Sequence, residues 1–347
     1  MMKKSWLLNF LLVMTLLIVT ACGAGGNSGN QNNDNGGGEN TSSSSERVML
    51  TVSTGSNTAV VYAYASTWAR IISEQYPEIM LNVQTSGGGK ENMSRLVEGR
   101  ADIGVGYGPE VEAAVRGLNE YEGQAEKYAQ LRGILTWPYA AVQLVVREDS
   151  GINSIEDLKG KRIAVGAPGS TGSTFVWPYV LPEFGITEEN SNWQYLSQTA
   201  AAEALGDGAV DAITALSKAK VGAIESLSLS HKIKLLPIPD PQRQNIIQNS
   251  YGLIAADQDP DLYGLNQVND KDKPIPTIGM TGTFLVHESV PEEVVYKITK
   301  ALFDNIDAFY MSHSAAKDIT LEGAIQDMPV PLHPGAEKYY KEVGLIQ

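Results

Sequence analysis

Apolar residues recur along this chain at two spacings, and segments of the two kinds alternate. Short apolar or alternating runs, which are typical of strands, are followed by stretches with apolar residues at helical spacing. In the first part of the chain, strands are predicted at 49–52, 79–85 and 101–107, and helices at 59–74 and 91–97. Strands that alternate with helices in this way indicate an α/β protein with a parallel or mixed sheet.

The same order of elements returns after residue 160. Strands are predicted at 162–166 and 210–214, and helices at 200–205 and from Phe175 to Pro182, where the proline ends the helix. One short pattern also repeats, at 96–102 and 205–211: leucine, an acidic residue, glycine, a small apolar residue and aspartate. Each copy predicts a helix that ends at a glycine and leads into a strand. The repeat indicates two lobes built on the same local plan.

The length and charge of the chain limit its architecture and its partners. A folded body over 47–347 has about 300 residues, more than one hydrophobic core usually supports, so two lobes are expected. The whole chain has 26 basic and 40 acidic residues and a net charge of −14. Without Lys3 and Lys4, 24 basic residues remain and the net charge is −16. Such acidity argues against nucleic acid or an anionic membrane as a partner.

The amino-terminal segment predicts export and a lipid anchor. Two lysines precede an apolar run over 6–19, which is too short for a membrane span but typical of a signal peptide. Val19-Thr20-Ala21-Cys22 then resembles a bacterial lipobox, and Cys22 is the single cysteine of the chain. Residues 1–21 are therefore predicted to be a lipoprotein signal peptide, with lipid on Cys22. An ordinary secretory signal with an incidental cysteine is the alternative.

The segment after the predicted signal peptide has the composition of a flexible tether. Residues 23–45 are mainly glycine, serine and asparagine, which cannot bury enough apolar surface to fold. A tether over 22–46 would span about 25 Å. The protein is thus expected to be extracytoplasmic, anchored to the outer face of the cell membrane as a lipoprotein, with its folded body held off the bilayer.

Loops rich in glycine and hydroxyl side chains follow strands at three places. They lie at 54–58, 86–89 and 168–174, each before a predicted helix. A helix N-terminus offers unpaired N–H groups and a positive dipole end, glycine lets a ligand approach, and hydroxyls add donors. Three such loops predict a shared cleft for a carboxylate or phosphate at the ends of the strands. Plain helix capping is the alternative for each loop.

Common catalytic and metal-binding motifs are not found in the sequence. The 168–174 loop lacks the lysine of a phosphate-binding loop, and there is no G-x-S-x-G nucleophile elbow. The four histidines are scattered without H-E-x-x-H or C-x-x-C spacing, so neither a metal nor a cofactor is predicted. We therefore expect a binding protein and not an enzyme. Aromatic residues near the predicted loop ends either wall a pocket or pack in a core: Tyr107, Trp137, Tyr139 and Trp177.

Several motifs occur in order along nearly the whole folded body. They are Thr54-Gly55-Ser56 with its following helix, Thr85-Ser86-Gly87-Gly88, Glu91-Asn92, Gly99-x-Ala101-Asp102-Ile103-Gly104, the stretch from Asp157-Leu158-Lys159-Gly160 to Ala167-Pro168-Gly169-Ser170, and Pro331-Leu332-His333-Pro334-Gly335-Ala336 before Tyr339-Tyr340. In these motifs the chain resembles the TAXI family of extracytoplasmic solute receptors, which serve TRAP-type transporters.

The resemblance implies a type II periplasmic-binding-protein-like α/β fold, in which two crossover strands join two α/β lobes with a ligand cleft between them. The crossovers are expected near 141–146 and 277–286. Lobe 1 would comprise 47–140 plus 285–347, and lobe 2 would comprise 141–284. The resemblance also implies a monomer, a small organic acid such as glutamate or a dicarboxylate as ligand, and an ion-coupled TRAP-type membrane permease as partner.

The ligand-binding positions of the family map onto the three loops. They are Thr54, Ser56, Asn57 and Thr58, then Ser86, Gly87, Gly88, Gly89 and Asn92, then Ser170, Thr171, Gly172, Ser173 and Thr174, with Tyr107 and Tyr139 as walls. Backbone amides and hydroxyls are expected to hold the acid group, and Asn92 either binds the ligand or caps its own helix. In the first loop, 57–62 replaces a glycine pair of the family, which leaves a ligand less access to the backbone. Gly172 is retained in the third loop.

Two other functions fit the same features. A lipoprotein that binds the same ligand and reports it to a membrane kinase would need the same loops and anchor. A neighbouring gene for a permease or for a kinase would distinguish these two roles. An exported hydrolase, the third possibility, would need a catalytic set that the motifs do not contain.

Overall fold

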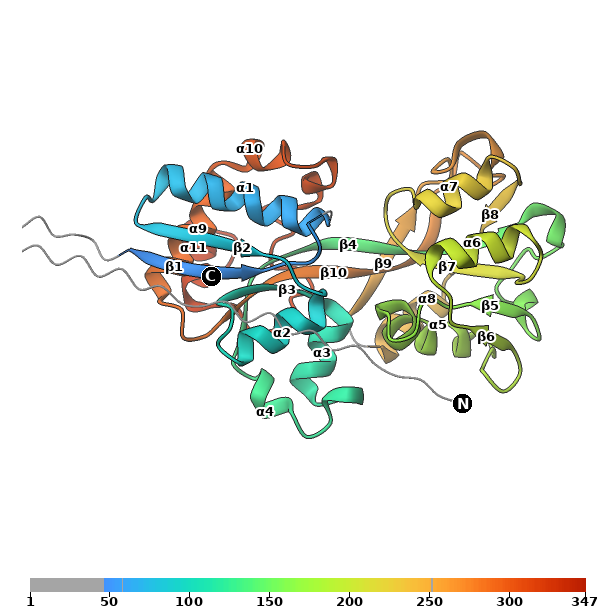
Figure 1. Cartoon of the computed structure of the whole chain (residues 1–347), viewed down its shortest axis with the longest axis horizontal. Helices are drawn as coiled ribbons and strands as arrows, with labels where there is room; N and C mark the ends of the chain where they lie inside the picture. Colours follow the sequence, from blue (N-terminus) through green and yellow to red (C-terminus); the bar gives the residue numbers. More distant parts are fainter. Residues whose placement is uncertain (1–46, 58, 251) are drawn as a thin grey trace, which may run out of the picture. The chain divides into compact units, whose positions relative to one another are not determined.

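A computed structural model describes residues 47–57, 59–250 and 252–347 of the chain (Figure 1). The predicted signal peptide (1–21), the predicted tether (22–46) with the lipidation site Cys22, and the predicted ligand residue Thr58 lie outside the described residues. Among the helices of the described part, none has the length and apolar content needed to cross a membrane.

Strands and helices alternate over the described chain, as predicted. The strands are β1 (Val48–Ser53), β2 (Ile79–Gln84), β3 (Ile103–Tyr107), β4 (Leu131–Arg147), β5 (Arg162–Ala164), β6 (Asn192–Gln194), β7 (Ala212–Leu216), β8 (Ile233–Leu235), β9 (Leu253–Gln258) and β10 (Ile275–His287). The helices are α1 (Val60–Gln75), α2 (Gly89–Val97), α3 (Gly108–Arg116), α4 (Ala125–Tyr128), α5 (Trp177–Glu183), α6 (Gln198–Gly206), α7 (Gly222–Ser228), α8 (Gln242–Asn249), α9 (Glu292–Asp304), α10 (Ile306–Tyr310) and α11 (Pro334–Glu342). Shorter helical turns include η1 (Asn119–Tyr121), the π-helix η4 (Gly172–Val176) and η6 (Ser314–Asp318).

The strands form one mixed sheet, with β4 and β10 side by side in its middle (Figure 1). The order is β2-β1-β3-β10-β4-β7-β5-β6, and β9 pairs with β10 while β8 pairs with β4. β1 is parallel to β2 and β3, and β5 is parallel to β6 and β7, whereas β4 and β10 are antiparallel to each other. Both predicted crossover segments, 141–146 and 277–286, lie inside these two long strands.

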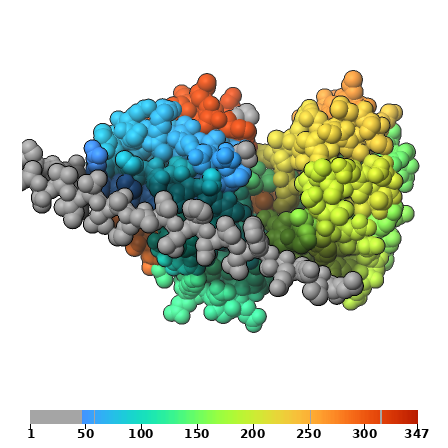
Figure 2. Space-filling view, in the orientation of Figure 1, coloured from blue at the N-terminus to red at the C-terminus, as the bar shows by residue number. Residues whose placement is uncertain are grey.

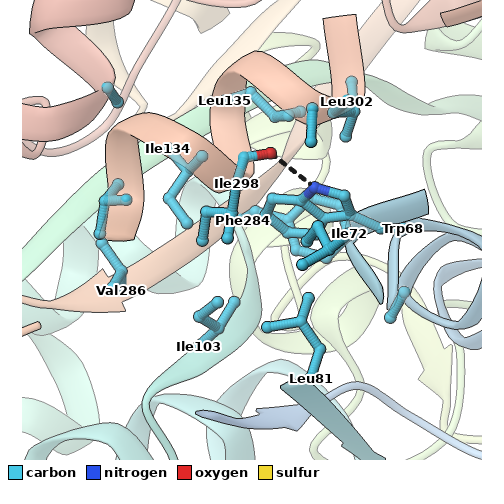
Figure 3. Packing of buried hydrophobic residues seen from close by; sticks show 14 of the residues in the cluster. Trp68, Ile72, Leu81, Ile103, Ile134, Leu135, Phe284, Val286, Ile298 and Leu302 are labelled. Carbon is cyan, nitrogen blue, oxygen red and sulfur yellow. Dashed lines mark hydrogen bonds between the residues drawn. The ribbon is translucent and has the colours of Figure 1, made fainter. Parts of the chain in front are cut away.

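The elements before β4 and after β10 share one hydrophobic core (Figure 3). Trp68 of α1 is fully buried, and its Nε1 donates a hydrogen bond to the backbone O of Ile298 in α9 over 2.8 Å. Phe284 of β10 packs on the Trp68 ring, with 5.0 Å between the ring centroids. Segments from the two ends of the described chain therefore stabilise each other. We call the elements around this core lobe 1: β1 to α4 together with α9 to α11.

The elements between β4 and β10 form two further clusters on either side of β5. Ile163 belongs to one cluster, with Trp177 and Leu181 of α5. Ala164 belongs to the other, with Leu205 of α6. Successive side chains of a strand point to opposite faces, so β5 is covered on both. We call this group, from β5 to β9, lobe 2, while the predicted boundaries at residues 140 and 285 stay a prediction.

The repeated sequence pattern has the same structure in both lobes. The carboxylate of Asp102 accepts a hydrogen bond from the N–H of Thr51 at 2.7 Å, and that of Asp211 accepts one from the N–H of Arg162 at 2.9 Å. The N–H of each aspartate donates in turn to the carbonyl of the same partner, at 2.9 Å and 2.8 Å. Each aspartate thereby joins its strand to a parallel neighbour. The prediction of a common local plan is confirmed.

The helix after the third loop differs from its prediction. It begins as the π-helix η4 and continues as α5, and Pro182 lies inside α5 instead of ending it. A proline removes one helical hydrogen bond, which a helix can lose close to its end without stopping. The chain leaves the helix at Gly185, which has a left-handed φ of +69°. α5 thus ends one residue after Pro182, and the left-handed Gly185 follows its C-cap residue Phe184.

Candidate functional site

A cavity of about 400 Å³ lies between residues of the two lobes. Tyr107 reaches it from the end of β3, Tyr139 from β4 and Met280 from β10. Lobe 2 supplies the rest of the wall: Val165, Gly166, Ala167, Ser170, Thr171, Gly172, Trp177, Ser197, Gln198, Thr214, Ala215, Leu216 and Val221. Figure 2 shows a notch in the surface where the teal segments meet the yellow and green ones. We call this cavity the interlobe pocket.

The interlobe pocket is lined by uncharged side chains. Among its lining residues in the described chain there is no Asp, Glu, Lys, Arg or His. The rings of Tyr107 and Tyr139 lie 4.6 Å apart between centroids, with 3.5 Å between their hydroxyl oxygens. Burial raises the pKa of the Tyr107 hydroxyl, which therefore keeps its proton. The pocket thus offers hydrogen bonds and aromatic surface, but no formal charge.

The third predicted loop contributes three of its five predicted residues to the pocket. Ser170, Thr171 and Gly172 line the cavity, whereas Ser173 and Thr174 do not. The Ser173 hydroxyl donates to the backbone O of Ala167 at 2.8 Å, and the N–H of Thr174 donates to the backbone O of Ser170 at 3.0 Å. These two residues hold the loop in shape behind the pocket wall.

The second predicted loop lies behind the pocket wall instead of lining it. Ser86, Gly87, Gly88 and Gly89 are not among the lining residues. A Cβ atom on Gly89 would lie 3.0 Å from Cδ2 of Tyr107 and would clash with the carboxylate of Glu110. Glycine is thus required where this loop packs against the residues that carry the lobe 1 wall. A direct ligand contact by this loop stays a prediction.

Asn92 is fully buried in the middle of α2, so it does not cap its own helix. Its Oδ1 accepts hydrogen bonds from the hydroxyls of Ser53 and Ser86, at 2.7 and 2.6 Å. Its Nδ2 donates to the backbone O of Thr54 and of Val105, at 2.6 and 2.8 Å. Both ends of the amide are occupied by protein groups. Asn92 therefore ties the first two loops to β3.

The described residues of the first predicted loop, 54–57, also lie outside the interlobe pocket. Thr54 is buried, and its hydroxyl donates to the backbone O of Gln84 at 3.0 Å. Ser56 and Asn57 are exposed and are not among the lining residues. The structure therefore brings together the third loop, Tyr107 and Tyr139, and leaves the first loop apart from them.

Several lining residues were not predicted to bind ligand. Gln198 begins α6, and its Nε2 donates to the backbone O of Thr214 at 2.8 Å, while its buried Oε1 has no partner in the described structure. Ser197 caps α6 by accepting the N–H of Ala200 at 3.4 Å. The sequence signal was a fourth polar stretch between a strand and a helix. It was missed because the helix was predicted to start at residue 200.

Contacts that join the lobes around the pocket in the described chain include the following three. The hydroxyl of Thr171 in lobe 2 donates to Oε1 of Glu110 in α3 at 2.6 Å. Nζ of Lys218, after β7, lies 2.8 Å from a carboxylate oxygen of Asp318 in η6. Gly108 at the start of α3 approaches Gly252, next to β9, so closely that neither could carry a Cβ atom. Of these residues, Thr171 also lines the pocket.

Glu110 is a buried carboxyl group that the sequence analysis did not single out. Only 7% of its surface is exposed, and its Oε2 has no hydrogen-bond partner in the described structure. Burial raises the pKa of this carboxyl group, and the hydrogen bond from Thr171 opposes that rise in part. Within the described residues, no group of three or more His, Cys, Asp or Glu side chains is arranged to hold a metal ion.

The fold and pocket are those of a periplasmic-binding-protein-like solute-binding protein, a mixed α/β sheet whose two lobes wall one cavity. The chain belongs to the NMT1-like family, a family of periplasmic solute-binding proteins, whose model matches residues 52–344.

Solved structures of low sequence identity are similar to this chain. The aliphatic sulphonate binding protein SsuA of Escherichia coli is 16% identical over 84% of this chain and 78% of its own, with a TM-score of 0.45. A TctC solute-binding protein from Polaromonas is 16% identical over 77% of this chain and 88% of its own, with a TM-score of 0.49. A TRAP periplasmic solute-binding protein from Ochrobactrum anthropi is 12% identical over 87% and 83%, with a TM-score of 0.48.

Proposed function

We propose that this protein is the solute receptor of a TRAP-type transporter. It binds a small organic acid, glutamate or a dicarboxylate, in the interlobe pocket and delivers it to an ion-coupled membrane permease. The observation that carries the proposal is one cavity of about 400 Å³ with walls from both lobes. Small-molecule sites typically have such a volume and combine aromatic surface with a few polar groups.

An acid can be held in this pocket by hydrogen bonds alone. Tyr107 and Tyr139 supply two hydroxyls on one side, and Ser197 supplies a third from lobe 2. A hydrogen bond to a charged group contributes about 1.5–3 kcal/mol. Two or three such bonds would offset part of the cost of removing a carboxylate from water, and the open side of the cavity would leave the rest of its hydration in place. The described lining residues include no cation, so a bound acid would not be held by an ion pair when it is released to the permease.

Binding would shift the equilibrium between arrangements of the lobes. A solute that touches both walls has a higher affinity for the arrangement in which the walls are close, so it increases the population of that state. The pairs Thr171–Glu110 and Lys218–Asp318 would then form or tighten. Bending would occur in β4 and β10, at lobe boundaries near 140 and 285. The first and second loops would contribute by supporting the position of Tyr107 from behind the pocket wall.

The location and partner of the receptor rest on the sequence. The lipobox at Val19-Thr20-Ala21-Cys22 supports a lipid anchor on Cys22 at the outer face of the cell membrane. The motif order supports membership of the TAXI group of TRAP receptors. A tether over 22–46 would let the folded body reach a permease in the same membrane.

Thermal unfolding with a panel of solutes tests the proposal. The chain without residues 1–21 would be heated alone and with glutamate, dicarboxylates, sugars and neutral amino acids. A ligand at 100 times its Kd should add about 2.7 kcal/mol, or roughly 4 °C for a folded body of this size. A shift with acids alone supports the proposal. A shift only with neutral solutes contradicts the acid ligand, and no shift with any solute contradicts the receptor role.

A matched pair of variants ties the shift to the pocket. Trp177 lines the interlobe pocket and Trp193 does not. Trp177→Phe should reduce the shift, because it changes the aromatic wall, whereas Trp193→Phe should leave it unchanged. Equal effects of the two substitutions would place the ligand elsewhere.

A further inference from the structure

Thr171 is a residue of the pocket wall that donates its hydroxyl hydrogen to a residue of the other lobe. It lines the cavity from lobe 2, at the start of η4, and its Oγ1 donates to Oε1 of Glu110 at 2.6 Å. A threonine hydroxyl has one hydrogen and two lone pairs. With its hydrogen on Glu110, Thr171 can offer a solute only lone pairs, which accept hydrogen bonds.

Glu110 is well placed to accept the hydrogen bond from Thr171. It lies in the first turn of α3, is 93% buried, and has no ion-pair partner in the described structure. Lys90, a nearby cation, is paired with Glu120 instead. An ionised carboxylate can only accept hydrogen bonds, so Thr171 is the donor in this pair while Glu110 is ionised.

Two neighbouring hydroxyl groups, those of Ser173 and Thr214, also donate their hydrogens to backbone carbonyls of the protein. The Ser173 hydroxyl lies 2.8 Å from the backbone O of Ala167 and 3.0 Å from that of Ser170, and in its 3.1 Å contact with the Ser170 hydroxyl either oxygen can be the donor. The Thr214 hydroxyl donates to the backbone O of Ala164 at 3.0 Å. The hydroxyls of Thr171 and Thr214 therefore offer only lone pairs, whereas Ser197, whose Oγ accepts the N–H of Ala200, keeps its hydrogen.

Gln198 adds a further acceptor to the same wall. Its Nε2 donates to the backbone O of Thr214 at 2.8 Å, which orients the amide and leaves Oε1 without a partner in the described structure. A buried acceptor without a donor is costly, because it has lost its hydrogen bond to water. A solute donor that reached Oε1, which is itself buried behind the surface of the wall, would remove that cost.

We propose that Glu110 is a specificity-determining residue that acts through Thr171, and that the lobe 2 wall selects a solute with an N–H or O–H donor in addition to its acid group. The favoured solutes are then amino acids or hydroxy acids, and plain dicarboxylates or keto acids are disfavoured. The inference rests on the proposed function, whose acid group would contact the tyrosines of the opposite wall. Glu110 is a positioning residue here, since it does not line the pocket.

Matched pairs of solutes test the inference by calorimetric titration of the chain without residues 1–21. Glutamate and glutarate differ only in the ammonium group, and 2-hydroxyglutarate and 2-oxoglutarate differ in a hydroxyl donor against a carbonyl acceptor. The donor-bearing member of each pair should bind at least about tenfold more tightly, because a buried acceptor left unpaired is costly. Equal affinities within both pairs would overturn the inference.

Three substitutions assign the preference to Thr171 and Glu110. Thr171→Val removes the hydroxyl at nearly constant shape, so it should weaken the donor-bearing solute and leave the other within about twofold. Thr171→Ser should restore the preference. Glu110→Leu frees the Thr171 hydroxyl to donate, so it should reduce the preference by improving binding of the donor-lacking solute. A purely structural role would change both solutes by the same factor, and that result contradicts the inference.

A measurement without solute separates this inference from the proposed function. If the unchanged protein binds no acid, the proposed function fails, and the Glu110–Thr171 relation is decided by a double-mutant cycle in urea unfolding. Glu110→Leu and Thr171→Val should be coupled by about threefold or more in the unfolding constant. Additive effects would show that Glu110 does not hold the Thr171 hydrogen, and would overturn the inference in either case.

Discussion

Gly108 and Gly252 bring the backbones of the two lobes into direct contact. A Cβ atom on Gly108 would lie 2.7 Å from the carbonyl O of Gly252, and one on Gly252 would overlap the carbonyl carbon of Gly108. Gly252 also has a left-handed φ of +63°. Gly108 directly follows the pocket residue Tyr107, so this contact sets how closely one pocket wall can approach the other.

Gly108→Ala should weaken solute binding without unfolding the protein. The added methyl group cannot fit unless the lobes move apart, so we expect a loss of about tenfold in affinity and a change of less than about 1 kcal/mol in the stability of the solute-free protein. Calorimetric titration and thermal unfolding measure the two effects. Gly222→Ala is the control, because nothing lies within 4 Å of a Cβ atom there. Unchanged affinity in Gly108→Ala would show that the contact is not needed for binding.

Tyr139→Phe should lower the affinity for an acid by about tenfold. The substitution keeps the ring that stacks near Tyr107 and removes one hydroxyl donor, and a hydrogen bond to a charged group contributes about 1.5–3 kcal/mol. Tyr195→Phe is the matched control, since Tyr195 is exposed and bonds to Glu188 away from the pocket. If both variants bind like the unchanged protein, the Tyr139 hydroxyl does not contact the solute.

Asp211→Asn should destabilise the protein at neutral pH and flatten the acid side of its stability profile. The side-chain hydrogen bond from Arg162, with the backbone N–H of the same residue, lowers the pKa of Asp211. A depressed folded-state pKa means that the stabilisation is present above the ordinary aspartate value of about 4 and is lost as the pH falls below it. We expect a loss of about 1–2 kcal/mol at pH 7. Urea unfolding between pH 3 and 7 measures it.

The exposed Glu126 offers a control for that profile, since Glu126→Gln should leave its shape unchanged. An Asp211→Asn protein that still loses stability on acidification as steeply as the unchanged protein would contradict the assignment to Asp211.

Glu110→Gln should stabilise the protein at neutral pH and have little effect near pH 4. Burial raises the pKa of Glu110, and the groups that face it are Tyr107, Tyr121, Thr171, and the ion pair of Lys90 with Glu120. A raised folded-state pKa means that the favourable contribution is complete below about pH 4 and is lost as the pH rises through the raised value. The neutral glutamine keeps that contribution at every pH.

Thermal unfolding of the Glu110→Gln protein and the unchanged protein from pH 4 to 8 measures this effect. The two curves should separate as the pH rises. Curves that stay parallel would show that the Glu110 carboxyl titrates with an unshifted pKa.

Local signals in the sequence were sufficient to predict the helices and strands, and to predict that the third loop binds ligand. The helical spacing of apolar residues predicted a helix over 59–74, where α1 now buries Trp68 and Ile72, and the repeated pattern ending in Asp102 and Asp211 predicted two lobes on one plan. These signals are local, because periodicity and glycine caps act over one or two turns of chain. Ser170 and Thr171 were predicted to bind ligand for the same reason, and they line the pocket.

The rest of the candidate site depends on contacts between residues far apart in the sequence. Asn92 carries the same signal as a ligand-binding amide, but its four hydrogen bonds to protein groups are settled only when α2 packs against β1 and β3. Glu110 and Thr171 are 61 positions apart, and no local pattern indicates that they meet. The sequence by itself determined the order of elements, the family motifs and the predicted export signal, since these follow from short segments. Which polar groups face the cavity, and which have their hydrogens bound elsewhere, was decided by the tertiary structure, because a hydrogen bond depends on where both partners lie in space.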